Sequence, residues 1–135
     1  MQTINWDHAV LDLAVNAADR PDPRSDLDLW DDAIIDLDIA LQDAAHARAI
    51  IDRESTALDR IEASHVLGIE GGNAETRRAR LTLVLADDAR YQVHQERLRE
   101  ARMQLMDAER RVTVAKERCR LLRTSIALTA NDEDR

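Results

Sequence analysis

All three glycines of this 135-residue chain lie within five positions, residues 68–72. Neither glycine nor proline occurs in residues 24–67 or after residue 72. Stretches of this length without a helix breaker favour two long helices joined by a single turn. We therefore expect a first long helix over about residues 25–67, a turn over 68–73, and a second long helix without interruption over about 74–129.

The residues around the turn favour the same boundaries. Glycine readily adopts the left-handed conformation with which many helices end, so the cluster is expected to close the first long helix in this way. Asn73 is a good N-cap, and Glu75 in the following turn is favoured by the helix dipole. The motif "GIEGG" lacks the Lys-Ser/Thr of a phosphate-binding loop, so it predicts a turn between helices.

Two prolines separate the N-terminal residues from the first long helix. Pro21 and Pro23 break any helix that begins near the N-terminus, and Ser25 or Asp22 can cap the next one. Residues 5–19 have apolar side chains at helical spacing. We expect them to form a short helix that packs on the otherwise unpaired end of the second long helix.

The composition favours helices over sheets. Hydrophobic residues make up 44% of the chain and charged residues 34%, while aromatic residues make up only 2% and phenylalanine is absent. A sheet protein would be richer in β-branched and aromatic residues. The expected fold is all-α and a single domain: a long antiparallel two-helix coiled-coil hairpin with a short N-terminal helix packed at its base.

Apolar residues recur at every seventh position in both long helices, which predicts the contact line of a coiled coil, called the seam below. The first helix has the series Trp30, Leu37, Ala44, Ile51, Leu58 and His65, with companions three positions later at Ala33, Ala40 and Ala47. The second has Val84, Tyr91, Leu98, Leu105, Val112, Cys119 and Ile126, with companions Asp87, His94, Ala101, Ala108, Ala115 and Leu122. The alanines predict a close approach of the two backbones.

The position of the turn predicts a register. If the chain folds back at about residue 71, Ile51 aligns with Tyr91, and Asp31 lies near Arg111. His94 at a seam position is expected to be a partly buried polar residue that specifies the register.

The apolar surface exceeds what one two-helix seam can cover, which predicts a homodimer or higher oligomer. We expect the interface at the base of the hairpin. Its expected residues are Trp30, Ile35, Ile39, Leu121, Leu122, Ile126 and Leu128.

Charge is distributed unevenly along a chain whose formal net charge is −8. The first half is acidic and most of the second half is basic. The arginines of the second helix are expected to pair with acids of the first, and nucleic-acid binding is the alternative. The candidate nucleic-acid contacts are Arg77, Arg78, Arg80, Arg97, Arg99, Arg102, Arg110 and Arg111.

Nothing in the sequence predicts an enzyme or a cofactor site. The strongest metal-like pattern is Glu62-x-x-His65, with Asp43-x-x-His46 as a weaker one, but the register places arginines rather than carboxylates opposite Glu62. Cys119 is the only cysteine. No stretch approaches the roughly 20 apolar residues of a membrane span, and no signal peptide is recognisable, so a cytoplasmic protein is expected.

Residues 68–109 carry a family resemblance. Gly-x-Asn is followed by Arg78 and Ala79, by leucines, by Asp88 and Tyr91, and by a Leu/Glu/Arg-rich segment. This order resembles small uncharacterised helical proteins of tailed bacteriophages, although those commonly have Lys in place of Gly72. The resemblance implies a phage origin, a cytoplasmic location in the host, and an accessory role in DNA replication or recombination.

Three functions follow as hypotheses. The first is a non-enzymatic, self-associating hairpin that binds a protein partner. The second is a nucleic-acid-binding protein that uses the arginines of the second helix. The third is an acidic inhibitor that mimics DNA through the carboxylates of residues 22–38.

Overall fold

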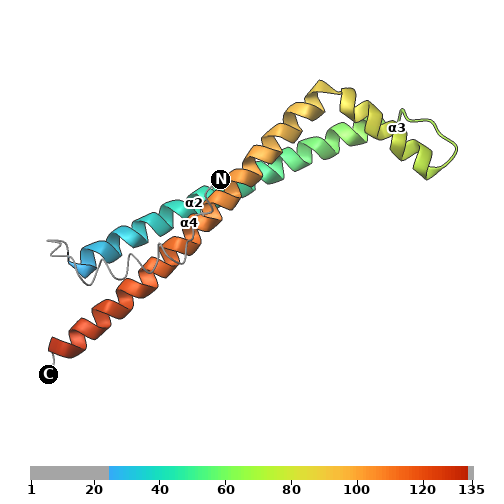
Figure 1. Ribbon diagram of the computed structural model, residues 1–135. Helices are drawn as coiled ribbons and strands as arrows, with labels where there is room; N and C mark the ends of the chain where they lie inside the picture. Colours follow the sequence, from blue (N-terminus) through green and yellow to red (C-terminus); the bar gives the residue numbers. More distant parts are fainter. Residues whose placement is uncertain (1–24, 134–135) are drawn as a thin grey trace, which may run out of the picture. The chain divides into compact units, whose positions relative to one another are not determined.

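The computed structural model describes residues 25–133, and this part of the chain is all-helical, as predicted (Figure 1). It contains α2 (Asp26–Val66), α3 (Ala74–Asp87) and α4 (Ala89–Glu133). The short helix expected over residues 5–19 lies outside the described residues. Within the described range, no helix combines the length and the apolar character that crossing a bilayer requires.

The predicted caps of α2 and α3 are confirmed. Ser25 begins α2 by accepting the backbone N–H of Asp28 on its hydroxyl oxygen at 3.3 Å. Asn73 begins α3 by accepting the N–H of Thr76 on its side-chain oxygen at 2.8 Å. Each cap satisfies a backbone donor that has no partner inside the helix.

The glycines form the turn, but not through the left-handed conformation that we expected. None of them has a positive φ. α2 ends instead in a tighter turn, where Gly68 N–H donates to the carbonyl of His65 at 3.1 Å. Gly71 is needed for space, because a Cβ atom at this position would lie 2.9 Å from Cγ of Arg77.

The second half of the chain forms two helices in place of the single helix expected over residues 74–129. Asp88 separates α3 from α4 and has an extended backbone, with φ of −81° and ψ of 111°. The interruption follows from the side chain of Asp88, which caps the next helix as described below.

The chain divides into two compact units. The terminal unit contains α2 through Asp43 and α4 from Asp107, and the central unit is Ala44–Met106. α2 and α4 run antiparallel within each unit (Figure 1). Ion pairs join them in the terminal unit, where Arg118 lies 3.0 Å from Asp36 and Arg111 lies 2.8 Å from Asp43.

Alanines form most of the deeply buried positions of both helices. Those of α2 are Ala33, Ala40, Ala44 and Ala47, and those of α4 are Ala101, Ala108 and Ala115. An alanine side chain can be fully buried between two helices only where the backbones approach closely. The burial of the alanines is thus as predicted, and it is consistent with a close approach of the two helices at these positions.

The observed register differs from the predicted one. Asp43, rather than Asp31, pairs with Arg111. In the central unit, His65 near the end of α2 faces Asp88 rather than a residue close to the turn. Pairing with α2 therefore begins where α4 begins, and α3 lies beyond the end of α2 (Figure 1).

Candidate functional site

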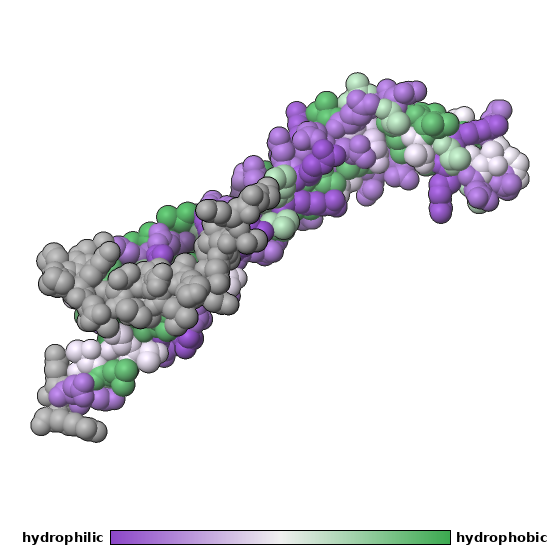
Figure 2. Space-filling view, in the orientation of Figure 1, coloured by the Kyte–Doolittle hydropathy of each residue, from purple (hydrophilic) through white to green (hydrophobic). Residues whose placement is uncertain are grey.

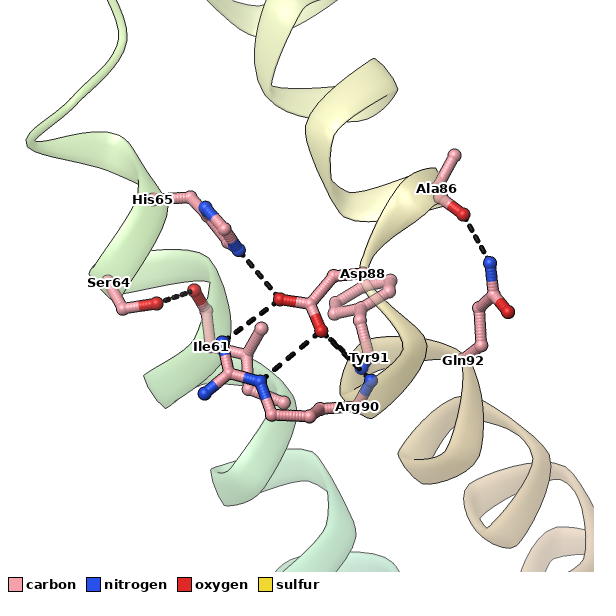
Figure 3. Close-up of polar contacts among 8 residues, drawn as sticks. All are labelled: Ile61, Ser64, His65, Ala86, Asp88, Arg90, Tyr91 and Gln92. Atoms are coloured by element: carbon pink, nitrogen blue, oxygen red, sulfur yellow. Dashed lines mark hydrogen bonds and ion pairs between the residues drawn. The ribbon is translucent and has the colours of Figure 1, made fainter.

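Asp88 joins two helices of the central unit. Its backbone N–H donates to the carbonyl of Leu85 at 3.1 Å and closes α3. Its Oδ1 accepts the backbone N–H of Arg90 at 2.9 Å and, more weakly, that of Tyr91 at 3.4 Å, which caps α4 (Figure 3). The side-chain amide of Gln92 bridges the same junction by donating to the carbonyl of Ala86.

The other carboxylate oxygen of Asp88 connects the junction to α2. Oδ2 lies 2.7 Å from Nε2 of His65 and 3.0 Å from Nη2 of Arg90 (Figure 3). The Arg90 guanidinium and the His65 imidazole hold the pKa of Asp88 well below its usual range. Asp88 is therefore ionised at neutral pH and acts as an acceptor for both groups, so His65 holds α2 against the point where α3 and α4 meet.

The metal-like patterns found in the sequence do not form ligand sets. His65 is bonded to Asp88, Glu62 is exposed, and Asp43 pairs with Arg111, while His46 is exposed. Among residues 25–133, no group of three or more His, Cys, Asp or Glu side chains is arranged to hold a metal ion. His65 takes part in the helix junction described above.

A second His–carboxylate pair lies in the seam of the central unit. Glu54 is only 2% exposed, and its Oε2 is hydrogen-bonded to Nδ1 of the half-buried His94. The Arg53 guanidinium lies 3.5 Å from the other carboxylate oxygen. The hydrogen bond from His94 lowers the pKa of Glu54 despite its burial, so the buried carboxylate is retained in its charged form.

The partly buried position predicted for His94 is confirmed, but its partner was missed. Glu54 lies seven residues after Ala47, and His94 lies seven residues before Ala101. Both therefore continue columns of buried alanines. Extending the companion series by one step beyond Ala47 would have identified Glu54 as a carboxylate in the seam.

The eight candidate nucleic-acid arginines are in different environments. Arg111 pairs with Asp43 and Asp107, Arg99 pairs with Glu96 on its own helix, and Arg80 donates to the carbonyl of Glu70. Pairing with α2 is thus observed for one of them. The other five are exposed and make no ion pair within residues 25–133: Arg77, Arg78, Arg97, Arg102 and Arg110.

The expected oligomer-interface residues are divided between core and surface. Leu122 is buried, and Trp30, Leu121 and Ile126 are half-buried. The exposed members of the set are Ile35, Ile39 and Leu128.

The two sides of the terminal-unit seam are chemically different. On one side, Asp36 and Asp43 of α2 pair with Arg118 and Arg111 of α4. These four residues directly precede seam residues, so they line the same side of the contact. Ion pairs close this side.

The other side of the terminal-unit seam carries exposed apolar residues, which we call the open flank. Leu27, Ile34 and Leu41 recur at seven-residue intervals and are 57%, 39% and 45% exposed. Ile34 directly follows the buried Ala33, which places this column on the side opposite the ion pairs. Figure 2 shows hydrophobic side chains on the surface of this part of α2.

Comparisons with protein-family models, with curated proteins and with solved structures give no match to this chain.

Proposed function

We propose that this chain is a non-enzymatic structural and interaction protein. It is an antiparallel two-helix coiled-coil hairpin that self-associates and binds a protein partner. The open flank carries this proposal, because three aliphatic side chains in a regular column are exposed beside the seam. Exposed apolar surface costs about 25 cal/mol per Å² relative to burial, so a column of this kind favours association.

The seven-residue spacing of buried residues supports the coiled-coil part of the proposal. Ala33, Ala40 and Ala47 lie at this spacing in α2, and Ala108 and Ala115 lie at it in α4. Charged pairs beside the seam are the other characteristic of coiled coils.

The cellular role proposed for the hairpin comes from the resemblance of residues 68–109 to phage helical proteins. In this role it is an accessory factor in phage DNA replication or recombination and acts in the host cytoplasm. Its contribution would be to hold a protein partner, since the polar clusters of the central unit are engaged in joining helices.

Sedimentation and affinity capture together test this proposal. We expect the chain to sediment as a dimer or larger species at micromolar concentration, above its 15.3 kDa chain mass. Ile34→Glu places a charge in the open flank and should weaken self-association, and a partner captured from phage-infected cells through the assembled form should be lost with it. Thr124→Glu is the matched control, because Thr124 is exposed on the side of α4 away from the seam. The proposal would be contradicted if the chain were a monomer and if no captured protein were lost with Ile34→Glu.

Nucleic-acid binding is the second candidate function. It is favoured by the exposure of Arg77 and Arg78, which make no ion pair within the described part of the chain. If these arginines contact phosphates, affinity for duplex DNA should fall steeply with salt. Replacing both by alanine should reduce the slope of log affinity against log salt by about two. If binding to duplex DNA did not change with salt or with the alanine substitutions of Arg77 and Arg78, this role would be excluded.

A further inference from the structure

A row of exposed acidic residues lies next to the open flank on the surface of α2. Asp31 and Asp38 follow Leu27 and Ile34 by four residues each, so they lie beside the apolar column on the surface of α2. Both acids are exposed, and neither makes an ion pair within residues 25–133. This face of α2 therefore combines an aliphatic column with a parallel acidic row.

The neighbouring face of α4 is basic. Lys116 and Arg123 directly follow the buried Ala115 and Leu122, as Ile34 follows Ala33 in α2. They therefore lie on the same side of the terminal-unit seam as the open flank. Both are exposed and make no ion pair in the described part of the chain.

The acids and bases lie at matching heights along the two antiparallel helices. The Asp36–Arg118 ion pair shows how far along α2 the charged end of a basic side chain of α4 reaches. Asp38 lies two residues after Asp36, and Lys116 lies two residues before Arg118, so the charged end of Lys116 can reach the height of Asp38. Asp31 lies seven residues before Asp38, and Arg123 lies seven residues after Lys116. Arg123 is therefore related to Asp31 as Lys116 is to Asp38.

We propose that a second copy of this chain docks on this face through a two-fold axis parallel to the helices. Such an axis keeps every residue at its own height and places α2 of one copy over α4 of the other. Asp38 then meets Lys116 of the second copy, and Asp31 meets Arg123, and symmetry produces each pair twice. This proposal rests on the self-association proposed above and specifies its surface and geometry.

The apolar column fits the same arrangement. Lys and Arg side chains can bury their aliphatic stems while the charged heads stay at the edge. In the dimer, the stems of Lys116 and Arg123 cover Leu27, Ile34 and Leu41, and the heads reach the acidic row. The apolar column supplies the burial, and the matched charges specify the orientation.

Charge reversal in trans tests the arrangement. One variant carries Asp31→Lys and Asp38→Lys, and the other carries Lys116→Glu and Arg123→Glu. Each alone places like charges opposite each other at all four pairs of the dimer. In an equimolar mixture, one chain of each kind forms four opposite-charge pairs. Arg110→Glu with Thr124→Glu is the control, because both residues are exposed on the side of α4 away from the seam.

Sedimentation and circular dichroism are measured for each protein and for the mixture. We expect a dimeric wild type and control, at least a ten-fold weaker association for each charge-reversed variant alone, and recovery of the dimer on mixing. If a variant loses helicity on its own, mixing should restore both helicity and mass.

Three results would overturn the docking geometry. Variants that remain dimeric alone, or a mixture that does not recover, would show that copies associate through another surface, and the proposed self-association would stand. A wild type that is monomeric at every concentration would remove both proposals and indicate that a different protein, or other residues of the same chain, covers the open flank.

Discussion

The imidazole of His94 is bonded to the carboxylate of Glu54 at a place where the alanine columns of α2 and α4 would otherwise continue. A buried ion pair often contributes less stability than apolar residues at the same positions, and it can specify which residues face each other. In columns made of identical alanines, neighbouring registers are similar in energy. The Glu54–His94 pair distinguishes them.

Alanine substitutions separate these two effects. His94→Ala leaves Glu54 buried without its main partner, so thermal melting followed by circular dichroism should show a loss of about 5 °C or more. Glu54→Ala should cost less, because the remaining imidazole is partly exposed. The double substitution extends both alanine columns and should recover most of the lost melting temperature. A double variant less stable than both single variants would contradict this interpretation.

The alanine columns should not accept larger residues. Ala40 is almost completely buried. Ala40→Leu inserts three carbon atoms between two close backbones and should lower the free energy of unfolding by about 1–3 kcal/mol, measured by urea denaturation. Ala45→Leu is the control, because Ala45 is exposed on the same helix. Equal effects of the two substitutions would show that the helices are not closely packed at Ala40.

Acid should weaken the central unit. The lowered pKa values of Asp88 and Glu54 stabilise the fold above the ordinary carboxyl pKa of about 4. This contribution is lost as the pH falls through that value towards the pKa of the folded state. Urea midpoints should therefore decrease from about pH 5 downwards.

Neutral substitutions provide the control for this pH dependence. Asp88→Asn and Glu54→Gln should be less stable than the wild type at pH 7 and should lose less on acidification. Parallel pH profiles for the wild type and both variants would rule out these two carboxyls as the source.

The Asp36–Arg118 pair offers a test of the observed register. Reversing either charge alone should lower the free energy of unfolding, and reversing both should restore about 0.2–1 kcal/mol relative to the sum of the single effects. The recovered part should shrink at high salt, because part of each side chain is exposed. Zero coupling at low salt would contradict the register.

The sequence predicts the ends of α2 and the start of α3 closely, because these depend on local chemistry. Ser25 and Asn73 act as caps in the structure as the sequence indicates. The alanine columns were also predictable, since a seven-residue period does not depend on the partner helix. The all-helical fold class and the buried face of each helix can therefore be predicted from local patterns.

The register was not predictable in this way. It depends on Asp88, whose backbone N–H ends α3 and whose side chain caps α4, and an aspartate in a helical sequence does not by itself reveal that role. The heptad series runs through this position from Val84 to Tyr91, so the periodicity gives no indication of the break. Asp88 was also not recognisable as the partner of His65, because that contact depends on where the turn brings the chain back.

The buried alanines also have a consequence for the thermodynamics of unfolding. Alanine has no side-chain rotamer entropy to lose on burial, so it lowers the entropic cost of folding. It also removes little apolar surface from water, and exposure of apolar surface is what raises the heat capacity on unfolding. The described helices should therefore unfold with a heat-capacity change per residue below the usual 12–15 cal/mol/K or so, which calorimetry can measure. Their stability should vary only gently with temperature, and cold should weaken them less than it weakens a protein with a core of large side chains.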